Sequence, residues 1–450
     1  MKQRLVVIGG VAAGMTAAAR ARRLNRDLEI IVLEKGPHIS YGACSLPYYL
    51  AGHFDDYRLL IARTPEEARE QGIDVRTGHE AVALDLDQRR VTVRAGGREE
   101  TIGFDVVLLA TGAVPVVPRG WELEGLAGVH FLRTIEDAQR LRSQVEAGAR
   151  RAVIVGGGYI GVEAADALRE QGAAVTIIDM LPQLLPNFDA DMARHVEDDL
   201  RADGVDVRLG DGMAELEAVD GRVVGVRTHA GERIGADLVL VAIGVRPNVA
   251  LAQAAGVPLG ETGAIAVDSR QRTRVEGVYA AGDCCEALHL VTGRPAYIPL
   301  GTTANKQGRV AGTVIAGGDA AFPGVVGTAA LKARRVTVAR TGLSLQQAQA
   351  MGYDAAAETI KAKDRVHSYP GAREIWVKLV AERGSGRLLG GQIAGLDGAG
   401  VAKRIDVVAT ALFHGMTVDQ FSYLDLSYAP PFSTVWDPLL TAANVLQRRV

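Results

Sequence analysis

One pattern occurs twice in this chain of 450 residues: a strand, a glycine-rich turn, a helix, a second strand and an acidic residue. The first copy has its glycines and acid at Gly9, Gly10, Gly14 and Glu34. The second has them at Gly156, Gly158, Gly161 and Asp179. Glycine lets the backbone approach a pyrophosphate, the helix N-terminus offers N–H donors, and the acid accepts from a ribose hydroxyl. The repeat therefore predicts an α/β chain that binds two dinucleotides.

Three further segments indicate which dinucleotides these are. An apolar strand ends in Thr111-Gly112, its counterpart after the second copy ends at Gly244, and a third strand ends in Gly282-Asp283. A flavin passes electrons between a hydride donor and another acceptor, so two dinucleotides in one chain suggest FAD with NADH or NADPH.

The ordered set of motifs resembles the pyridine nucleotide-disulfide oxidoreductases over nearly the whole chain. The resemblance implies two Rossmann-like dinucleotide-binding domains and a C-terminal α+β dimerisation domain. It implies that residues 1–112 and 248–322 form the FAD domain, that 113–247 form the NAD(P)H domain, and that 323–450 form the interface of a homodimer.

The resemblance also gives roles to residues outside the glycine turns. In relatives, the counterpart of Asp283 binds the flavin ribityl chain, and that of Tyr159 covers the flavin until nicotinamide enters. The counterpart of Glu163 lies on the nicotinamide side, and Ala304 begins a helical segment near the flavin pyrimidine. A packed core aromatic and a surface charge are the alternatives for Tyr159 and Glu163.

Cys44 is the expected redox-active residue. The dithiol branches of the family carry a Cys-x4-Cys pair, but no second cysteine lies near Cys44. The surrounding Cys-Ser-Leu-Pro-Tyr-Tyr resembles the single-cysteine branch, and the coenzyme A-disulfide reductases most. A helix expected over 45–50 would favour the Cys44 thiolate. The first glycine loop lacks the histidine of the peroxidases and water-forming oxidases, which weakens the peroxide and oxygen alternatives.

Coenzyme A is the leading candidate for the small thiol. Relatives contact it at positions that correspond here to Thr16, Arg20, Arg23 and Ser40. Arg20 and Arg23 share one helix face, and phosphates require cations, although solvated helix charge is an equal alternative. Tyr369 and Tyr428 lie beside prolines, in segments where relatives reach into the partner's active site, so we expect catalytic tyrosines and shared active sites. Packing of the interface alone is the alternative.

The expected activity is reduction of a small-thiol disulfide by NAD(P)H. Reduction of a coenzyme A persulfide or polysulfide, NADH oxidation by oxygen, and electron transfer to a protein acceptor remain alternatives. Asp179 should repel a 2′-phosphate, and residues 180–186 contain no arginine, so NADH is expected over NADPH.

Composition excludes several other classes. The net charge of −3 gives no basic footprint for nucleic acid, and no apolar run reaches the ~20 residues of a membrane span. Leu5–Ala19 is interpreted as strand, turn and helix rather than as a signal peptide. The three cysteines favour a reducing compartment, so a cytoplasmic protein is expected, and no metal-ligand spacing occurs. Cys284 and Cys285 are expected to be buried small residues rather than an electron relay.

Overall fold

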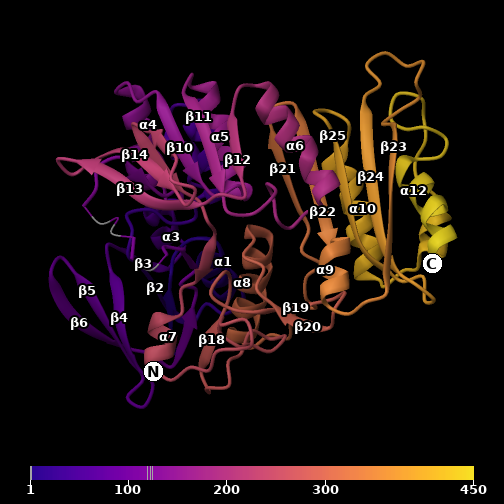
Figure 1. The fold of residues 1–450 in the computed structure, drawn as a ribbon. Helices are drawn as coiled ribbons and strands as arrows, with labels where there is room; N and C mark the ends of the chain where they lie inside the picture. The colour runs from indigo at the N-terminus through magenta and orange to yellow at the C-terminus, as the bar shows by residue number, and fades with distance from the viewer. Residues whose placement is uncertain (1–2, 119, 122, 124) are drawn as a thin grey trace.

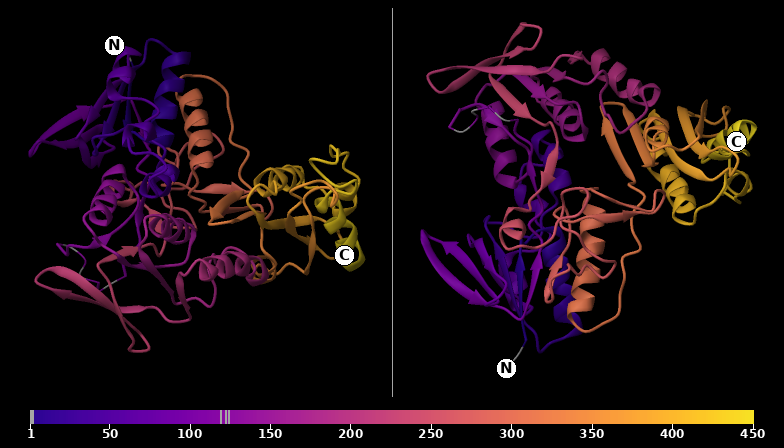
Figure 2. Two further views of the ribbon diagram at one scale, coloured as in Figure 1. Left: turned by 90° about the horizontal axis from the view of Figure 1, so that it is seen from above. Right: turned by 60° about the horizontal axis from the view of Figure 1, so that its bottom comes forward.

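The computed structural model describes residues 3–118, 120–121, 123 and 125–450. Two parallel sheets with their helices lie one above the other in Figure 1, and an antiparallel domain, drawn in orange and yellow, stands beside them. The turned views in Figure 2 show the same three bodies, with the C-terminus at the far end of the third. The α/β class expected from the sequence is confirmed.

The first parallel sheet has the order β18-β7-β1-β2-β3. Its strands are β1 (Arg4–Ile8), β2 (Glu29–Glu34), β3 (Asp74–Thr77), β7 (Val106–Leu109) and β18 (Val278–Ala280). Alternate side chains of β1 leave opposite faces, as strand geometry requires. Leu5 and Val7 pack with helices α1 (Ala12–Leu24) and α8 (Gly301–Ile315). Val6 and Ile8 pack toward an antiparallel meander of β4 (Glu80–Asp85), β5 (Arg90–Ala95) and β6 (Arg98–Gly103).

The second parallel sheet repeats this plan in the order β12-β11-β10-β16-β9. Its strands are β9 (Val129–His130), β10 (Arg151–Val155), β11 (Ala174–Asp179), β12 (Asp206–Leu209) and β16 (Leu238–Val241). Ala152 and Ile154 pack toward α4 (Ile135–Glu146), α5 (Tyr159–Glu170) and α6 (Ala190–Ala202). Val153 and Val155 pack toward the meander of β13 (Met213–Val219), β14 (Arg222–Thr228) and β15 (Arg233–Gly235).

Short elements connect these sheets. The crossing strands β8 (Ala113–Pro115) and β17 (Val245–Pro247) pair antiparallel where the chain enters and leaves the second sheet. The hairpin β19 (Ala287–His289) and β20 (Arg294–Ala296) follows β18. The remaining short helices are α2 (Leu46–Leu50), α3 (Pro65–Glu70) and α7 (Ala250–Ala254), with 3-10 turns η1 (Ala43–Ser45) and η2 (Tyr57–Leu60).

The C-terminal domain is a five-stranded antiparallel sheet in the order β21-β22-β25-β24-β23. Its strands are β21 (Ala329–Ala333), β22 (Val336–Gly342), β23 (Ala355–Lys363), β24 (Glu374–Glu382) and β25 (Leu388–Leu396). Its helices are α9 (Leu345–Ala350), α10 (Val401–Phe413), α11 (Val418–Ser422) and α12 (Pro438–Leu446), followed by the 3-10 turn η3 (Gln447–Arg449). Within the described residues, no helix is long and apolar enough to cross a membrane.

Candidate active site

The two glycine turns are shaped by close backbone contacts. Gly9 has φ +108°, and a Cβ there would lie 2.1 Å from the Ala110 carbonyl oxygen. A Cβ on Gly14 would lie 1.9 Å from the Gly9 carbonyl oxygen, and one on Gly161 would lie equally close to that of Gly156. Only glycine fits at these contacts, because they bring each helix against the end of its strand.

The acids at the ends of β2 and β11 hold the same loops together. Glu34 Oε2 accepts from the Gly10 N–H at 2.8 Å, and Asp179 Oδ2 accepts from the Gly157 N–H at 2.7 Å. In each case the other carboxylate oxygen accepts from a backbone N–H just downstream. Carboxylate oxygens have further lone pairs, so both acids could still accept from a ribose hydroxyl.

Other predicted cofactor residues lie around these turns. Gly282 has φ +88°, and a Cβ there would lie 2.9 Å from Ala13 Cβ and 3.5 Å from Ala304 Cβ. Helix α8 begins three residues before the predicted start at Ala304, which is itself buried. The Thr111 hydroxyl donates to the Asn248 carbonyl at 2.6 Å, and Gly112 has φ +70°. A Cβ on Gly158 or Gly244 would meet no heavy atom within 4 Å, so both glycines border open space.

Arg133 is a site residue that the sequence analysis missed. It immediately precedes Thr134, the N-cap of α4, and its Nη2 donates to Asp283 Oδ2 at 3.0 Å across 150 positions of sequence. Nearby, the Tyr297 hydroxyl is buried with no partner among the described residues. Burial first, and Asp283 second, raise the pKa of Tyr297. An isolated arginine before a helix N-cap carries no motif that could have revealed this contact.

Cys44 lies in the 3-10 turn η1, two residues before α2, so it precedes a short helix as expected, and that helix begins at Leu46 rather than Ser45. Its residue is exposed, and its Sγ is 4.0 Å from the position of a Cβ on Gly301, the first residue of α8. Burial of the thiol, then the carboxylates of Glu163 and Asp283, raise the pKa of Cys44, and Arg133 lowers it. Burial and these two carboxylates therefore oppose the thiolate, while Arg133 favours it; that the start of α2 also favours the thiolate stays a prediction.

Tyr159 and Glu163 lie on the first turns of α5, which begins at Tyr159, three residues before the helix that the second glycine pattern predicts over 162–171. The Tyr159 ring packs against Phe188, with centroids 6.3 Å apart, and burial raises its pKa to about 12. Burial first, and Asp166 second, raise the pKa of Glu163 to about 7. No described residue forms a hydrogen bond or ion pair with the Glu163 carboxylate.

The predicted substrate residues lie where α1 meets α8 and beside the first glycine loop. Thr16 Oγ1 donates to Asn305 Oδ1 at 2.7 Å, and Arg20 Nε donates to Thr313 Oγ1 at 3.0 Å. Arg23 is exposed. Ser40 has φ +47°, and its N–H donates to the Gly10 carbonyl at 3.0 Å. These contacts join the two helices, and the motifs gave no sign of the α8 partners.

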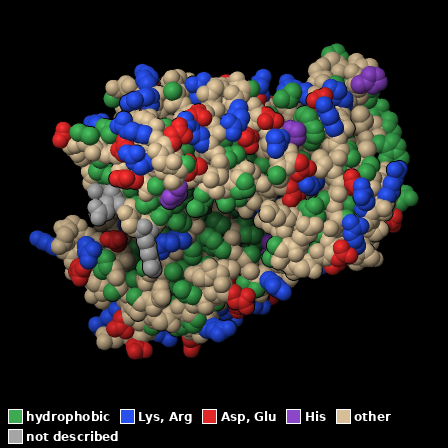
Figure 3. All heavy atoms as spheres, in the orientation of Figure 1, with side chains coloured by type: hydrophobic (Ala, Val, Ile, Leu, Met, Phe, Trp, Pro, Cys, Tyr) green, Lys and Arg blue, Asp and Glu red, His purple; other side chains and the backbone are tan. Residues whose placement is uncertain are grey.

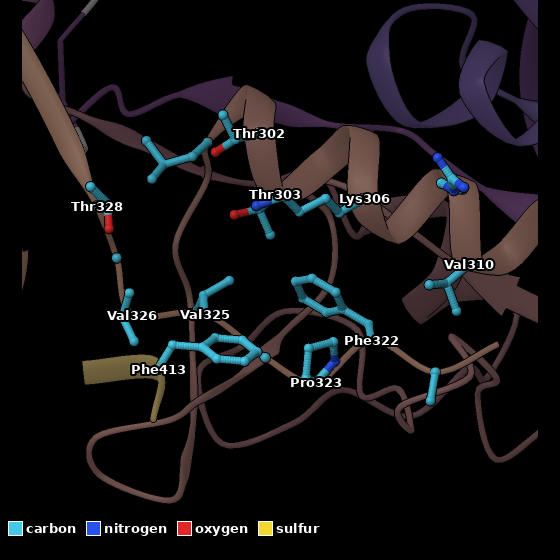
Figure 4. Close-up of a pocket in the computed structure, with 15 residues that line it drawn as sticks. Thr302, Thr303, Lys306, Val310, Phe322, Pro323, Val325, Val326, Thr328 and Phe413 are labelled. Atoms are coloured by element: carbon cyan, nitrogen blue, oxygen red, sulfur yellow. The ribbon is translucent and has the colours of Figure 1, made fainter. Parts of the chain in front are cut away.

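A cavity of about 400 Å³ lies on another face of α8. Figure 4 shows Thr302, Thr303 and Lys306 projecting from the helix toward the ring of Phe322, with Phe413 of the C-terminal domain at the far side. Arg309 also lines it, so α8 brings two cations and two hydroxyl groups to the cavity, opposite a wall that is apolar except for Thr328. Cys44 does not line this cavity, but Leu300 and Thr302 adjoin Gly301, which lies next to its sulfur.

The structure does not bring Tyr369 and Tyr428 to Cys44 by any described contact within the chain. Tyr369 is 40% exposed and lies between β23 and β24, and Tyr428 is 48% exposed and precedes α12. Tyr423, Phe432 and Trp436, in or near the same segment as Tyr428, are also exposed. Cys284 and Cys285, by contrast, are 0% and 4% exposed, and Cys284 Sγ donates to the Leu109 carbonyl at 3.3 Å.

Fold and site together define an oxidoreductase with two nucleotide sites and a cysteine between them. On the face shown in Figure 3, hydrophobic side chains gather in a hollow between the two sheets. The chain belongs to the pyridine nucleotide-disulphide oxidoreductase family. The family's sequence model matches residues 3–308, and the model of its dimerisation domain matches residues 328–438. Members of this family depend on FAD and NAD(P)H.

Three relatives illustrate the range of the family. The chain is 40% identical over 451 residues to a protein of Pyrococcus horikoshii named NAD(P)H coenzyme A polysulfide/persulfide reductase, covering 99% of each chain. It is 28% identical over 438 residues to the coenzyme A disulfide reductase of Staphylococcus epidermidis, covering 96% of each. A solved NAD-dependent persulfide reductase from A. fulgidus superposes with a TM-score of 0.96 at 41% identity, covering 99% of this chain and 83% of the other.

The residues present fit both cofactors of the family. In the first turn, the close backbone contacts of Gly9 and Gly14 hold the loop against the end of its strand, and the Tyr297 hydroxyl, which has no partner among the described residues, leaves a polar group available. The second turn offers the open space at Gly158. FAD would be held by the first turn, Glu34 and Asp283, and the nicotinamide nucleotide by the second turn and Asp179.

Proposed function

We propose that this protein reduces the S–S bond of coenzyme A disulfide with NADH, through the single cysteine Cys44. The observation that carries the proposal is the position of Cys44 in the exposed turn η1, with its sulfur beside the start of α8. Cys284 and Cys285 are buried and cannot meet a soluble disulfide. FAD, when bound, supplies the relay of two electrons from NADH to sulfur. The proposal assigns FAD to residues 1–112 and 248–322 and NADH to 113–247.

Cys44 would act as the nucleophile. Its thiolate attacks one sulfur of the disulfide, the S–S bond breaks, and the first thiol leaves while Cys44 forms a mixed disulfide with the other half. Two electrons and a proton then release the second thiol and restore the Cys44 thiolate. The Arg133 cation lowers the pKa of Cys44, so it supports the attacking thiolate.

The tail of the substrate would be recognised by cations around α1 and α8. Phosphates of coenzyme A need such partners. Thr16, Arg20, Arg23 and Ser40 offer one surface, and the cavity with Lys306 and Arg309 offers another. Two double variants distinguish these surfaces: Arg20→Ala/Arg23→Ala and Lys306→Ala/Arg309→Ala. Replacing the pair that binds the phosphates should raise the KM for coenzyme A disulfide about tenfold or more, since one charge-assisted hydrogen bond contributes about 1.5–3 kcal/mol.

The C-terminal domain would complete the site from a second copy. Residues 323–450 then form the homodimer interface, where exposed aromatics are enriched. Tyr428, with help from Tyr369, would hydrogen-bond the departing thiolate of the partner subunit. Tyr428→Phe should keep the dimer and the FAD content while slowing thiol release. Wild-type rates in the Tyr369→Phe/Tyr428→Phe double variant would contradict this role.

Reduction of a coenzyme A persulfide is the second candidate. It is favoured by the 40% identity to the Pyrococcus protein, which exceeds the 28% identity to the disulfide reductase. The same cysteine would serve, because a persulfide also presents an S–S bond to a thiolate.

Steady-state NADH oxidation tests these proposals. The rate of the wild-type protein is measured with each of four acceptors: coenzyme A disulfide, coenzyme A persulfide, oxygen alone and a protein acceptor. The first should give the largest kcat/KM; a larger value for the persulfide would establish the second candidate. Cys44→Ser should keep the FAD spectrum and lose reduction of both thiol substrates, whereas near-normal turnover in this variant would refute the assigned nucleophile.

A further inference from the structure

A small groove lies between α5 and the segment that follows Cys44 in the chain. It has a volume of about 40 Å³, more than the ~10–15 Å³ that one water needs. Pro47 and Tyr48 of α2, three and four residues after Cys44, form one wall, and α5 forms the other. The groove thus begins one helical turn from the proposed nucleophile.

The α5 wall carries three carboxylates at positions 163, 166 and 170, and two of them are already paired. Arg334 donates to Asp166 from its N–H at 3.1 Å and from Nη1 at 3.0 Å. Glu170 Oε2 bonds His53 Nε2 at 2.8 Å. Glu163, nearest the start of α5, has no partner among the described residues, so it is the carboxylate free to exchange a proton.

The opposite end of the groove is open to solvent. The side chains of His53 and Glu170 are 51% and 35% exposed, and both line the groove. The Tyr48 ring lies 5.7 Å from the His53 ring, between centroids. Lys332 of β21 faces the same space and pairs with Asp397 at 3.0 Å. Titratable groups therefore continue from Glu163 to the surface on every element that lines the groove.

We propose that this groove is the proton path of Cys44, with Glu163 as the proton-holding residue and the His53–Glu170 pair as its mouth. The inference rests on the proposed thiol reduction, which takes one proton from water in each cycle: R–S–S–R, NADH and H⁺ become two R–SH and NAD⁺. The S–S bond breaks, NADH supplies both electrons, and the groove supplies the proton that the hydride does not bring. A persulfide substrate has the same balance, with H₂S as one product.

The experiment compares Glu163→Gln with the control Glu197→Gln, which changes the same residue type on α6, where Glu197 pairs with Arg201. Proton uptake in a single turnover is followed with an indicator dye. Glu163→Gln should slow uptake and thiol release about 100-fold, the usual scale for loss of a general acid, and the rate of FAD reduction by NADH is measured separately so that any effect at the nicotinamide side is told apart from it. Added imidazole should restore much of the rate, which it would not do for a structural defect. Glu197→Gln should match the wild type.

Two pH-dependent readouts complete the test. Since the pKa of Glu163 is about 7, the protonated donor is lost above that pH; thiol release should fall there in the wild type but not in Glu163→Gln. Alkylation of Cys44 against pH should show a lower pKa in Glu163→Gln, because the carboxylate that raises it is gone. His53→Gln should slow proton uptake a few-fold.

The outcomes separate the two proposals. Wild-type proton uptake and an unshifted Cys44 pKa in Glu163→Gln would overturn the proton path. Failure of the wild type to reduce any thiol substrate would overturn the proposed function, while the Cys44 alkylation profile would still report whether Glu163 controls the sulfur.

Discussion

The two glycine units have the same strand order and the same acid-to-loop hydrogen bond, but their surroundings differ. In the first, α8 closes over α1 so tightly that a Cβ on Gly308 or Gly312 would lie 2.3 Å from a carbonyl oxygen of α1. In the second, Gly158 faces open space, and Val11 stands at the matching place of the first unit. A unit whose helix is covered by α8 suits a cofactor that stays bound, and an open turn suits one that enters and leaves in each cycle.

The largest effect is expected where the two units are alike. Gly14→Ala and Gly161→Ala each place a methyl group 1.9 Å from a backbone oxygen. Each should lower the free energy of unfolding by about 3 kcal/mol, because backbone atoms cannot move aside cheaply. Thermal unfolding measures this, and absorbance measures bound FAD. Gly14→Ala should lose FAD, and Gly161→Ala should keep it. Equal FAD loss in both would break the distinction between the units.

The second effect concerns the third loop position, where the first unit has Val11 and the second has Gly158. Gly158→Ala adds a methyl group to open space, so the unfolding free energy should change by less than about 0.5 kcal/mol. Because that space is where the nucleotide would lie, the Kd for NADH should rise about tenfold, equivalent to about 1.4 kcal/mol. Isothermal titration gives the Kd, with Val11→Ala as the matched control. An unchanged Kd for NADH would show that the open turn does not bind it.

A third test concerns the acid of the second unit. Asp179→Asn should reduce kcat/KM for NADH about tenfold, since a hydrogen bond to a carboxylate contributes about 1.5–3 kcal/mol. It should also reduce the ratio of kcat/KM for NADH to kcat/KM for NADPH. Steady-state rates with both nucleotides measure it. A wild-type preference for NADPH, or an unchanged ratio in the variant, would contradict the role given to Asp179.

The smallest expected effect on stability concerns an aspartate beside the N-terminal end of the first strand in each unit. Asp237 accepts from the N–H groups of Arg150 and Arg151, both at 2.9 Å, and Asp105 accepts from the Arg4 N–H at the matching place. Arg151 holds the pKa of Asp237 at about 2, below the ordinary 3.8. A depressed folded-state pKa stabilises the fold above the ordinary value and loses that contribution as the pH falls toward 2.

Asp237→Asn should therefore lower stability at pH 7 by about 1 kcal/mol or less, as for other surface ion pairs. The difference from wild type should shrink between pH 4 and pH 2. Urea unfolding at several pH values measures it. A difference that stays constant down to pH 2 would mean that the Asp237 charge contributes nothing.

The fold class and the family were predictable because their signals are local. Gly14 packs against Gly9, five residues earlier, and Gly9 packs against Ala110 at the end of β7, the strand next to β1. Glu34 and Asp179 each accept a hydrogen bond from the glycine loop of their own βαβ unit. The assignment of individual residues to FAD, NADH and coenzyme A remains a prediction. Helix starts were misplaced by three residues at α5 and α8, because glycine and threonine give weak signals for a helix start.

What the sequence determined by itself, then, is the twofold nucleotide plan and a single accessible cysteine in a family motif. The tertiary structure alone decided that Arg133 meets Asp283, that Glu163 lies in a groove with His53 with no partner among the described residues, and that burial and charge raise the pKa of Cys44. The physical reason is how far apart in the chain the interacting residues lie. The strand, glycine turn, helix and acid of each unit follow one another within a short stretch of chain, whereas electrostatics and burial act between groups that only docking of the sheets and helices brings together.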